Sequence, residues 1–193
     1  VIYQPNEPSA YVLASSLGMG EEQAEPYEVV TPNYTKFGRA MFEDVRACAG
    51  QRAVVAPMVC LPGLSHFEQD MLEYYQDPQG VAEKKRAEGE AMLEAARQIL
   101  SWKPDVLLIG NSGMMIFNPP PIFRTLALEW MQKVTRMAKE HGVLCHMHTC
   151  GPERALVELA ANETDLTSIE PLEVPPMGDC DLKEIKQKFG RRL

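Results

Sequence analysis

The sequence predicts an α/β fold in which the strands of a parallel sheet alternate with helices. Strand-like apolar runs and segments with helical spacing of apolar residues follow one another four times along the 193-residue chain. This order is typical of a parallel sheet whose strands are joined by right-handed crossovers. Residues 105–110 are the clearest strand, because their apolar run is continuous, as in strands buried on both faces. An open doubly wound sheet and part of a (β/α)8 barrel both fit this pattern.

The first segment, residues 1–36, is rich in Pro, Glu and Ser and is expected to be irregular. Within it, residues 11–14 are a candidate edge strand. After this segment, apolar spacing predicts helices over residues 37–49, 78–103, 123–141, 153–159 and 182–189. Apolar runs predict strands over residues 53–59, 105–110, 142–150 and 167–172.

The ends of two predicted helices carry recognisable signals. Asp77 followed by Pro78 is an N-cap candidate with proline in the first turn, and Pro104 ends the same helix. Asp181 and Glu184 form an acidic variant of the capping box at the start of the last helix. These signals fix where the helices begin more sharply than apolar spacing alone.

Four strand–helix units make about half of a barrel, since a complete (β/α)8 barrel takes roughly 250 residues. We therefore expect an irregular segment over residues 1–35 and a partial barrel domain over residues 36–193. A half barrel leaves unpaired strand edges, which proteins normally pair or cover. The chain is expected to be a piece of a longer protein, or to close its sheet against a second copy as a homo-oligomer.

The composition excludes several classes of function. A net charge of −8 argues against binding to nucleic acid or to an anionic membrane surface. No apolar run approaches the roughly 20 residues that cross a bilayer, and no signal peptide is recognisable. The five cysteines are scattered, which predicts reduced thiols in a cytoplasmic protein. No glycine-rich motif for a dinucleotide or a P-loop follows any strand.

The stretch HMHTCG, residues 146–151, carries the main candidates for chemistry. Residues two apart on a strand face the same way, so His148 and Cys150 lie about 6–7 Å apart along it, within reach of one zinc ion. His146 lies about 13 Å from Cys150 along the strand and is expected deeper in the sheet, as a hydrogen-bonded or core residue. A histidine and a cysteine at a strand end can also have no role.

Two features favour a metal or a reactive thiolate over that neutral interpretation. The pair lies at the C-terminal end of a parallel strand, where α/β folds place their chemistry. A predicted helix starts directly afterwards, at residues 152–153, and its amides are expected to favour an adjacent thiolate.

Other polar residues near the predicted strand ends are weaker candidates. Glu170 ends the next strand and is a candidate ligand or general acid–base group, or a solvated carboxylate. Cys180 is a candidate third zinc ligand, although a free loop cysteine is the better interpretation. Asn111 and Ser112 follow the strand over residues 105–110 and are candidates for binding a substrate or for capping the next turn.

Several segments of the chain together resemble the uroporphyrinogen decarboxylase superfamily. They are Ala56-Pro57, a helix that ends at residues 74–78, HGVLCHMHTCG over residues 141–151, and LEVPPMGDCDLKEIKQKFG over residues 172–190. The resemblance covers most of residues 36–193 in order. It implies a (β/α)8 barrel. The superfamily includes cobalamin-dependent methyltransferases, which move a methyl group from a corrinoid to a thiol.

The H-x-C-G motif is similar to that of the methyltransferase branch. This resemblance implies a zinc ion held by His148, Cys150 and a further cysteine, which lies later in the sequence unless Cys180 replaces it. It also implies methylcobamide, bound to a corrinoid protein or free, as methyl donor and a small thiol as acceptor. On this view Glu170 and Asn111 are candidate catalytic residues, and Ser112 and His146 candidate cofactor-binding residues.

Two alternatives stay open at this point. The decarboxylase branch is a carboxy-lyase that acts on a tetrapyrrole, and it has a tyrosine soon after the strand that corresponds to residues 54–58. Residues 54–65 of this chain contain no tyrosine, which weakens that alternative. The other alternative is a non-catalytic module that binds a corrinoid or another small ligand.

Overall fold

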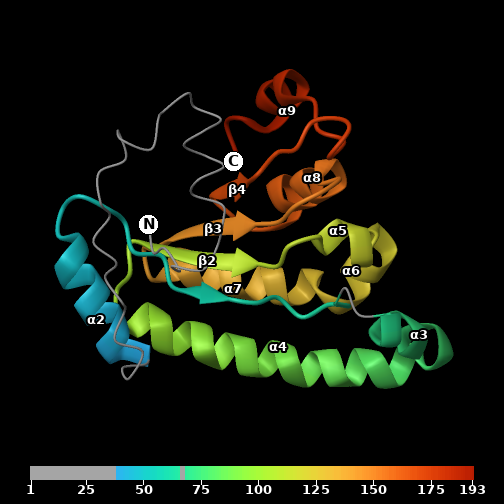
Figure 1. The fold of residues 1–193 in the computed structure, drawn as a ribbon, viewed down its shortest axis with the longest axis horizontal. Helices are drawn as coiled ribbons and strands as arrows, with labels where there is room; N and C mark the ends of the chain where they lie inside the picture. Colours follow the sequence, from blue (N-terminus) through green and yellow to red (C-terminus); the bar gives the residue numbers. More distant parts are fainter. Residues whose placement is uncertain (1–37, 66–67) are drawn as a thin grey trace, which may run out of the picture. The chain divides into compact units, whose positions relative to one another are not determined.

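Four parallel strands form one sheet, in the order in which they occur along the chain (Figure 1). The structure is a computed structural model that describes residues 38–65 and 68–193, so the predicted irregular segment and its edge strand lie outside the described residues. The strands are β1 (Met58–Val59), β2 (Val106–Gly110), β3 (Leu144–His148) and β4 (Ser168–Glu170). The mixed α/β class with a parallel sheet is therefore confirmed.

The order of the four described strands is compatible with a partial β/α barrel. A doubly wound sheet reverses its strand order at a switch point, whereas a β/α barrel adds each new strand on the same side. The described strands follow the second pattern without a reversal. The sheet thus corresponds to consecutive β/α units, and closure into a barrel stays a prediction.

Helices precede and connect these strands. They are α2 (Gly38–Ala49), α3 (Glu68–Gln76), α4 (Pro78–Ser101), α5 (Met114–Phe117), α6 (Pro120–Leu126), α7 (Leu128–Glu140), α8 (Arg154–Glu163) and α9 (Leu182–Phe189). The two predicted N-caps are confirmed: Asp77 accepts from the amide of Gly80 at 2.9 Å, and Asp181 accepts from the amide of Glu184 at 3.0 Å. No helix in the described part of the chain is long and apolar enough to span a membrane.

Two predicted elements differ from the structure. The helix expected over residues 123–141 is divided into α6 and α7 at Ala127, whose φ of −120° is not helical, although hydrogen bonds continue across it. The strand expected over residues 53–59 is confined to β1. Pro57 has no amide hydrogen to donate, and its carbonyl accepts from Leu108, so regular pairing begins only after it.

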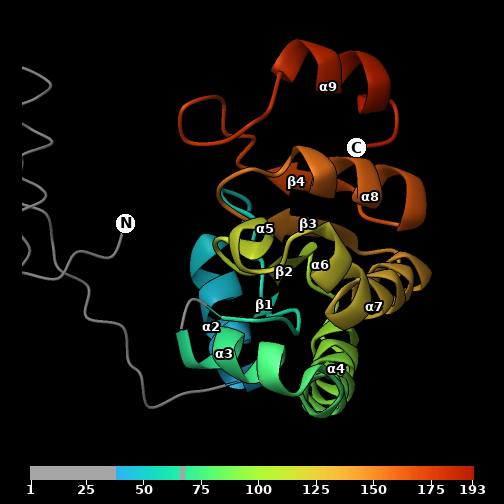
Figure 2. The same ribbon diagram turned by 90° about the vertical axis from the view of Figure 1, so that its right-hand side faces the viewer.

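The two faces of the sheet have different environments. Alternate residues of β2 and β3, such as Leu107 and Met147, are fully buried with apolar side chains of α4 and α7. Figure 2 shows α4, α7 and α8 along this side of the sheet. On the other face, Met58 and Leu144 are 44% and 57% exposed, and His146 and His148 are half-buried. The candidate residues thus point to the more open face.

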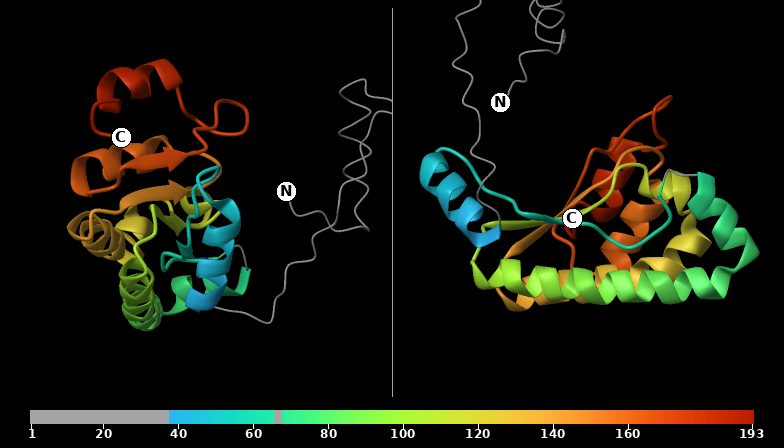
Figure 3. Two further views of the ribbon diagram at one scale, coloured as in Figure 1. Left: turned by 90° about the vertical axis from the view of Figure 1, so that its left-hand side faces the viewer. Right: turned by 60° about the horizontal axis from the view of Figure 1, so that its bottom comes forward.

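Close packing fixes the helical layer against the sheet. A side chain at Gly89 of α4 would lie 2.2 Å from the ring of Trp130 on α7, so the indole occupies the space that glycine leaves. α2 lies beside the C-terminal end of α4 (Figure 3). There Phe42 packs on Trp102 with ring centroids 5.7 Å apart. Arg46 also donates to the carbonyl of Lys103 at 2.7 Å.

Candidate functional site

The C-terminal ends of β3 and β4 bring a cysteine, a histidine and a glutamate together. His148 and Glu170 are register partners in the sheet. The Nδ1 atom of His148 lies 2.6 Å from Oε1 of Glu170, and its Nε2 atom lies 3.5 Å from Sγ of Cys150. A carboxylate can only accept, so Nδ1 carries the proton, and in the neutral imidazole the lone pair of Nε2 faces the sulphur. The imidazole therefore presents a base, or a metal ligand, to Cys150.

Glu170 contacts a second histidine as well. Nε2 of His146 lies 3.6 Å from Oε1 of Glu170, and Nδ1 of His146 lies 2.7 Å from the hydroxyl of Ser168. The hydrogen bond from His148 lowers the pKa of Glu170, so this residue is a carboxylate at neutral pH. His146 was expected deeper in the sheet as a hydrogen-bonded or core residue. It is hydrogen-bonded to Ser168, but its side chain is 28% exposed on the more open face, so it is not a core residue.

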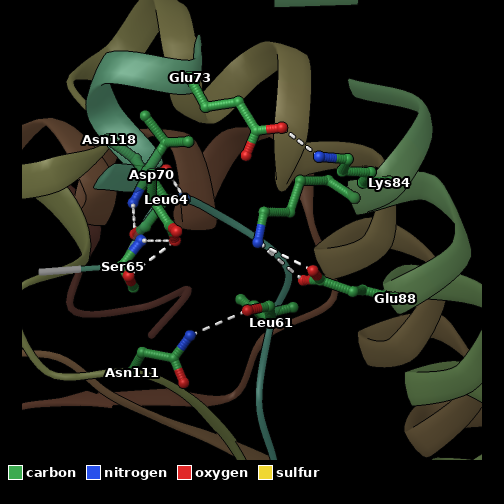
Figure 4. A network of polar contacts seen from close by, with 10 residues as sticks. Leu61, Leu64, Ser65, Asp70, Glu73, Lys84, Glu88, Asn111 and Asn118 are labelled. Carbon is green, nitrogen blue, oxygen red and sulfur yellow. Dashed lines mark hydrogen bonds and ion pairs between the residues drawn. The ribbon is translucent and has the colours of Figure 1, made fainter. Parts of the chain in front are cut away.

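Ser112 lies beside the cysteine, whereas Asn111 is occupied elsewhere. The hydroxyl of Ser112 lies 3.4 Å from Sγ of Cys150. The amide of Asn111 donates to the carbonyl of Leu61 at 2.9 Å, which ties the end of β2 to the segment that follows β1 (Figure 4). The structure thus gives Asn111 a structural contact, and it brings Ser112 to the candidate site.

Cys180 is not part of this group. It lies in the loop between β4 and α9 and packs against Val157 and Ile185 in an apolar cluster. Burial raises its pKa to about 11, so it is a neutral thiol at neutral pH. Within residues 38–65 and 68–193, no three His, Cys, Asp or Glu side chains are grouped in a way that could hold a metal ion. Of the two interpretations of Cys180, this packing favours the free loop cysteine over a third zinc ligand.

The geometry of His148 and Cys150 nevertheless fits two of the ligands of a zinc ion. Tetrahedral zinc with Zn–N near 2.0 Å and Zn–S near 2.3 Å places its nitrogen and sulphur ligands roughly 3.5 Å apart. The Nε2–Sγ distance of 3.5 Å has this value. Zinc-binding histidines usually donate their other nitrogen to a carboxylate, as His148 does to Glu170. The distances among His148, Cys150 and Glu170 are thus compatible with two zinc ligands and a carboxylate that orients one of them.

The start of α8 does not act as the sequence predicted. Its amides were expected to favour a thiolate at Cys150. Instead, the amide of Gly151 donates to Oε2 of Glu173 at 2.6 Å, and the amide of Arg154 donates to Oδ1 of Asp179 at 3.0 Å. Both carboxylates come from the loop after β4, which sequence reasoning did not single out for chemistry. The helix start is thus already neutralised by acidic side chains.

A buried glutamate completes this acidic region. The side chain of Glu153 is 0% exposed, and no described side chain donates a hydrogen bond to its carboxylate oxygens; only the main-chain amides of Glu153 and Glu173 act on it. Burial, and then the charge of Glu173, raise the pKa of Glu153 to about 7. Its position three residues after Cys150 was the only signal in the sequence, and that signal does not reveal burial.

Comparison with protein-family models, with curated proteins and with solved structures found no match for this chain. The resemblance described above is not tested by these comparisons and stays a prediction.

Proposed function

We propose that this chain belongs to a zinc-dependent methyltransferase that moves a methyl group from a methylated corrinoid to a thiol. The observation that carries the proposal is the 3.5 Å distance between Nε2 of His148 and Sγ of Cys150, with Nδ1 of His148 held by Glu170. This arrangement combines a soft sulphur ligand with an oriented imidazole, a ligand pair that suits zinc.

Each residue of the group has a distinct role in the proposal. His148 and Cys150 would hold the zinc ion, together with a ligand from outside the described residues. A bound zinc ion lowers the pKa of a thiol and keeps it as a thiolate. Glu170 holds His148 in the tautomer that leaves Nε2 unprotonated. Ser112 places its hydroxyl against the sulphur of Cys150, where it can donate a hydrogen bond to a thiolate.

A metal-free nucleophilic cysteine is a second function suggested by the Cys150–His148–Glu170 relay, which has the order of a catalytic triad. Such enzymes need amides that stabilise an oxyanion beside the nucleophile. Here the amide of Gly151, directly after the cysteine, already donates to Glu173. The local charge is also negative, which disfavours an unassisted thiolate, so we prefer the metal.

The carboxy-lyase alternative has less support from the described residues. A tetrapyrrole with several carboxylates requires cationic partners. The segments that follow the four strands, residues 60–67, 111–119, 149–153 and 171–181, contain no lysine or arginine. Only an assay of turnover distinguishes a non-catalytic binding module from an enzyme.

The first experiment measures zinc in the purified protein. We expect about one zinc per chain in the unmodified protein and no retained zinc after Cys150→Ala, because the variant loses a thiolate ligand of the proposed site. Cys48→Ala is the matched control, since Cys48 is exposed on α2, away from the C-terminal ends of the strands. Equal zinc contents in the Cys150→Ala and unmodified proteins would exclude the proposed site.

Methyl transfer from methylcobalamin to a thiol, followed by the absorbance of the demethylated corrinoid, then distinguishes an enzyme from a binding module.

A second prediction concerns the carboxylate that orients His148. Glu170→Ala is expected to weaken zinc binding by roughly 10- to 100-fold, as loss of such a partner typically does. Glu170→Gln retains an acceptor for Nδ1 and should lie between the two. Zinc affinity is measured by competition with a chelator, with Glu158→Ala on the exposed side of α8 as control. An unchanged affinity of Glu170→Ala would mean that His148 is not oriented in this way.

A further inference from the structure

The segments that follow the strands near Cys150 are poor in basic residues. The four segments that follow β1 to β4 are residues 60–67, 111–119, 149–153 and 171–181, and none contains lysine or arginine, although the chain has 19 of these residues. The same segments contain four carboxylates: Glu153, Glu173, Asp179 and Asp181. The C-terminal ends of parallel strands meet at one edge (Figure 2), and ligands of such sheets bind there. The charge at this edge therefore bears on which ligand is accepted.

Carboxylates flank Cys150 on both sides along the chain. Glu173 accepts from the amide that follows the cysteine, at 2.6 Å, and Glu170 accepts from the imidazole that precedes it, also at 2.6 Å. Buried Glu153 adds a further carboxyl group, to which no described side chain donates a hydrogen bond. Within the described part of the chain, no lysine, arginine or histidine forms an ion pair with Glu153, Glu173 or Asp179.

Among lysines and arginines, Arg154 is the residue nearest to Cys150 in the sequence. The guanidinium of Arg154 points to Glu184 on α9 at 2.7 Å, a carboxylate that Lys188 also contacts at 2.6 Å. The main-chain amide of Arg154, and not its side chain, faces Asp179. Among the described residues, the guanidinium of Arg154 thus forms no ion pair with Glu153, Glu173 or Asp179.

Apolar side chains lie beside the same carboxylates. Ile116 of α5 is 54% exposed and packs against Gly151, where an added Cβ would lie 2.9 Å from its Cδ1 atom. Gly178 packs on the carbonyl of Gly151, within the loop whose Val174 and Met177 are 48% and 72% exposed. A ligand that reaches Cys150 therefore meets apolar and acidic surface.

From this distribution we infer that the acceptor thiol carries no negative charge: the site selects a cationic aminothiol, then a neutral thiol, over a thiol with a sulfonate or carboxylate group. The inference rests on the proposed function, because it names the substrate class of the same site. Any positive charge of a zinc ion would be matched by the thiolate sulphurs bound to it. The distal end of the acceptor would still lie near Glu170 and Glu173.

The first test needs no zinc and no turnover. Metal-free protein with Cys60→Ser is treated with two methanethiosulfonates, the cationic trimethylammonioethyl and the anionic sulfonatoethyl reagent. A cysteine thiolate attacks the sulfenyl sulphur, forms a disulfide and releases methanesulfinate. Modification at Cys150 and at exposed Cys48 is followed by mass spectrometry of their peptides. The ratio of cationic to anionic rate at Cys150 should exceed that at Cys48 by about tenfold, and salt should reduce the difference.

Matched variants assign this preference to the carboxylates. Glu173→Gln keeps an acceptor for the amide of Gly151 but removes the charge, so it should lower the ratio at Cys150 by about threefold. Glu158→Gln, an exposed carboxylate on the outer side of α8, should leave the ratio unchanged. A ratio at Cys150 equal to or below that at Cys48 in the parent protein would overturn the inference.

The second test compares acceptors that share one carbon skeleton. With methylcobalamin as donor, the rates should fall in the order cysteamine, mercaptoethanol, mercaptoethanesulfonate. Fastest transfer to mercaptoethanesulfonate would overturn the inference while the proposed function stood. Absence of transfer to all three thiols, with the charge preference at Cys150 intact, would instead overturn the proposed function and leave the selectivity of the edge in place.

Discussion

Asn118→Leu is expected to lower the free energy of unfolding by about 3–5 kcal/mol, because it removes a fully satisfied buried amide. Asn118 is 0% exposed. Its Oδ1 accepts from the amide of Leu64 at 2.7 Å, and its Nδ2 donates to the carbonyl of Leu64 at 3.0 Å (Figure 4). The same Nδ2 donates to the carbonyl of Met114 at 3.1 Å. Leucine has a similar volume but leaves the buried main-chain groups of Leu64 without partners.

Urea denaturation followed by circular dichroism measures this effect. Asn118→Asp should also be strongly destabilising, since a carboxylate would face the two carbonyls that now accept from the amide nitrogen. Asn162→Leu is the matched control on the exposed side of α8 and should change the stability by no more than about 0.5 kcal/mol. A loss below 1 kcal/mol for Asn118→Leu would mean that water replaces these hydrogen bonds.

The contacts of Asn118 also matter for the candidate site. Together with the bond from Asn111 to Leu61, they fasten the segment after β1 to the segments after β2. Ser112, which lies against Cys150, belongs to one of these fastened segments. The position of the strand-end edge is therefore set by two buried or half-buried asparagine amides, neither of which contacts the cysteine.

The parts of the fold that the sequence predicted are those determined locally. The N-caps at Asp77 and Asp181 were predicted because a cap needs only its own helix, and both are present. β2 was predicted because its apolar run is continuous. The pairing of His148 with Glu170 could be anticipated only as far as their neighbouring strand ends, since the register itself depends on the whole sheet.

The contacts that the sequence did not reveal join residues that are distant along the chain. Asn118 and Leu64 are 54 residues apart, and Gly151 and Glu173 are 22 apart. Nothing in the local pattern around Glu173 indicates that it occupies an amide beside Cys150. Cys180 remained a candidate ligand because the sequence does not show in which direction a loop residue points. That direction is set by tertiary packing.

Glu153→Gln is expected to stabilise the protein above neutral pH and to have little effect near pH 4.5. The pKa of Glu153 rises from an ordinary value of 4.5 to about 7 on folding, first because of burial and then because of Glu173. Below pH 4.5 the folded and unfolded chains both bind this proton, so the carboxyl costs nothing through ionisation. Between pH 4.5 and 7 only the folded chain binds it, and the free energy of unfolding falls as the pH rises.

Above pH 7 both states are ionised, and the folded protein carries the full cost of about 3 kcal/mol. Glutamine has nearly the same shape and stays neutral, so the variant avoids this cost.

The difference in free energy of unfolding between Glu153→Gln and the unmodified protein should therefore grow from near zero at pH 4.5 to about 2–3 kcal/mol at pH 8. Urea titrations across this range measure it, with Glu158→Gln on the exposed side of α8 as the control. A constant difference for Glu153→Gln would mean that the carboxylate is solvated or paired with a cation when it ionises. In that case Glu173 and Asp179 would no longer form an unbalanced acidic region next to Cys150, so this measurement also tests the charge on which the selectivity of the site depends.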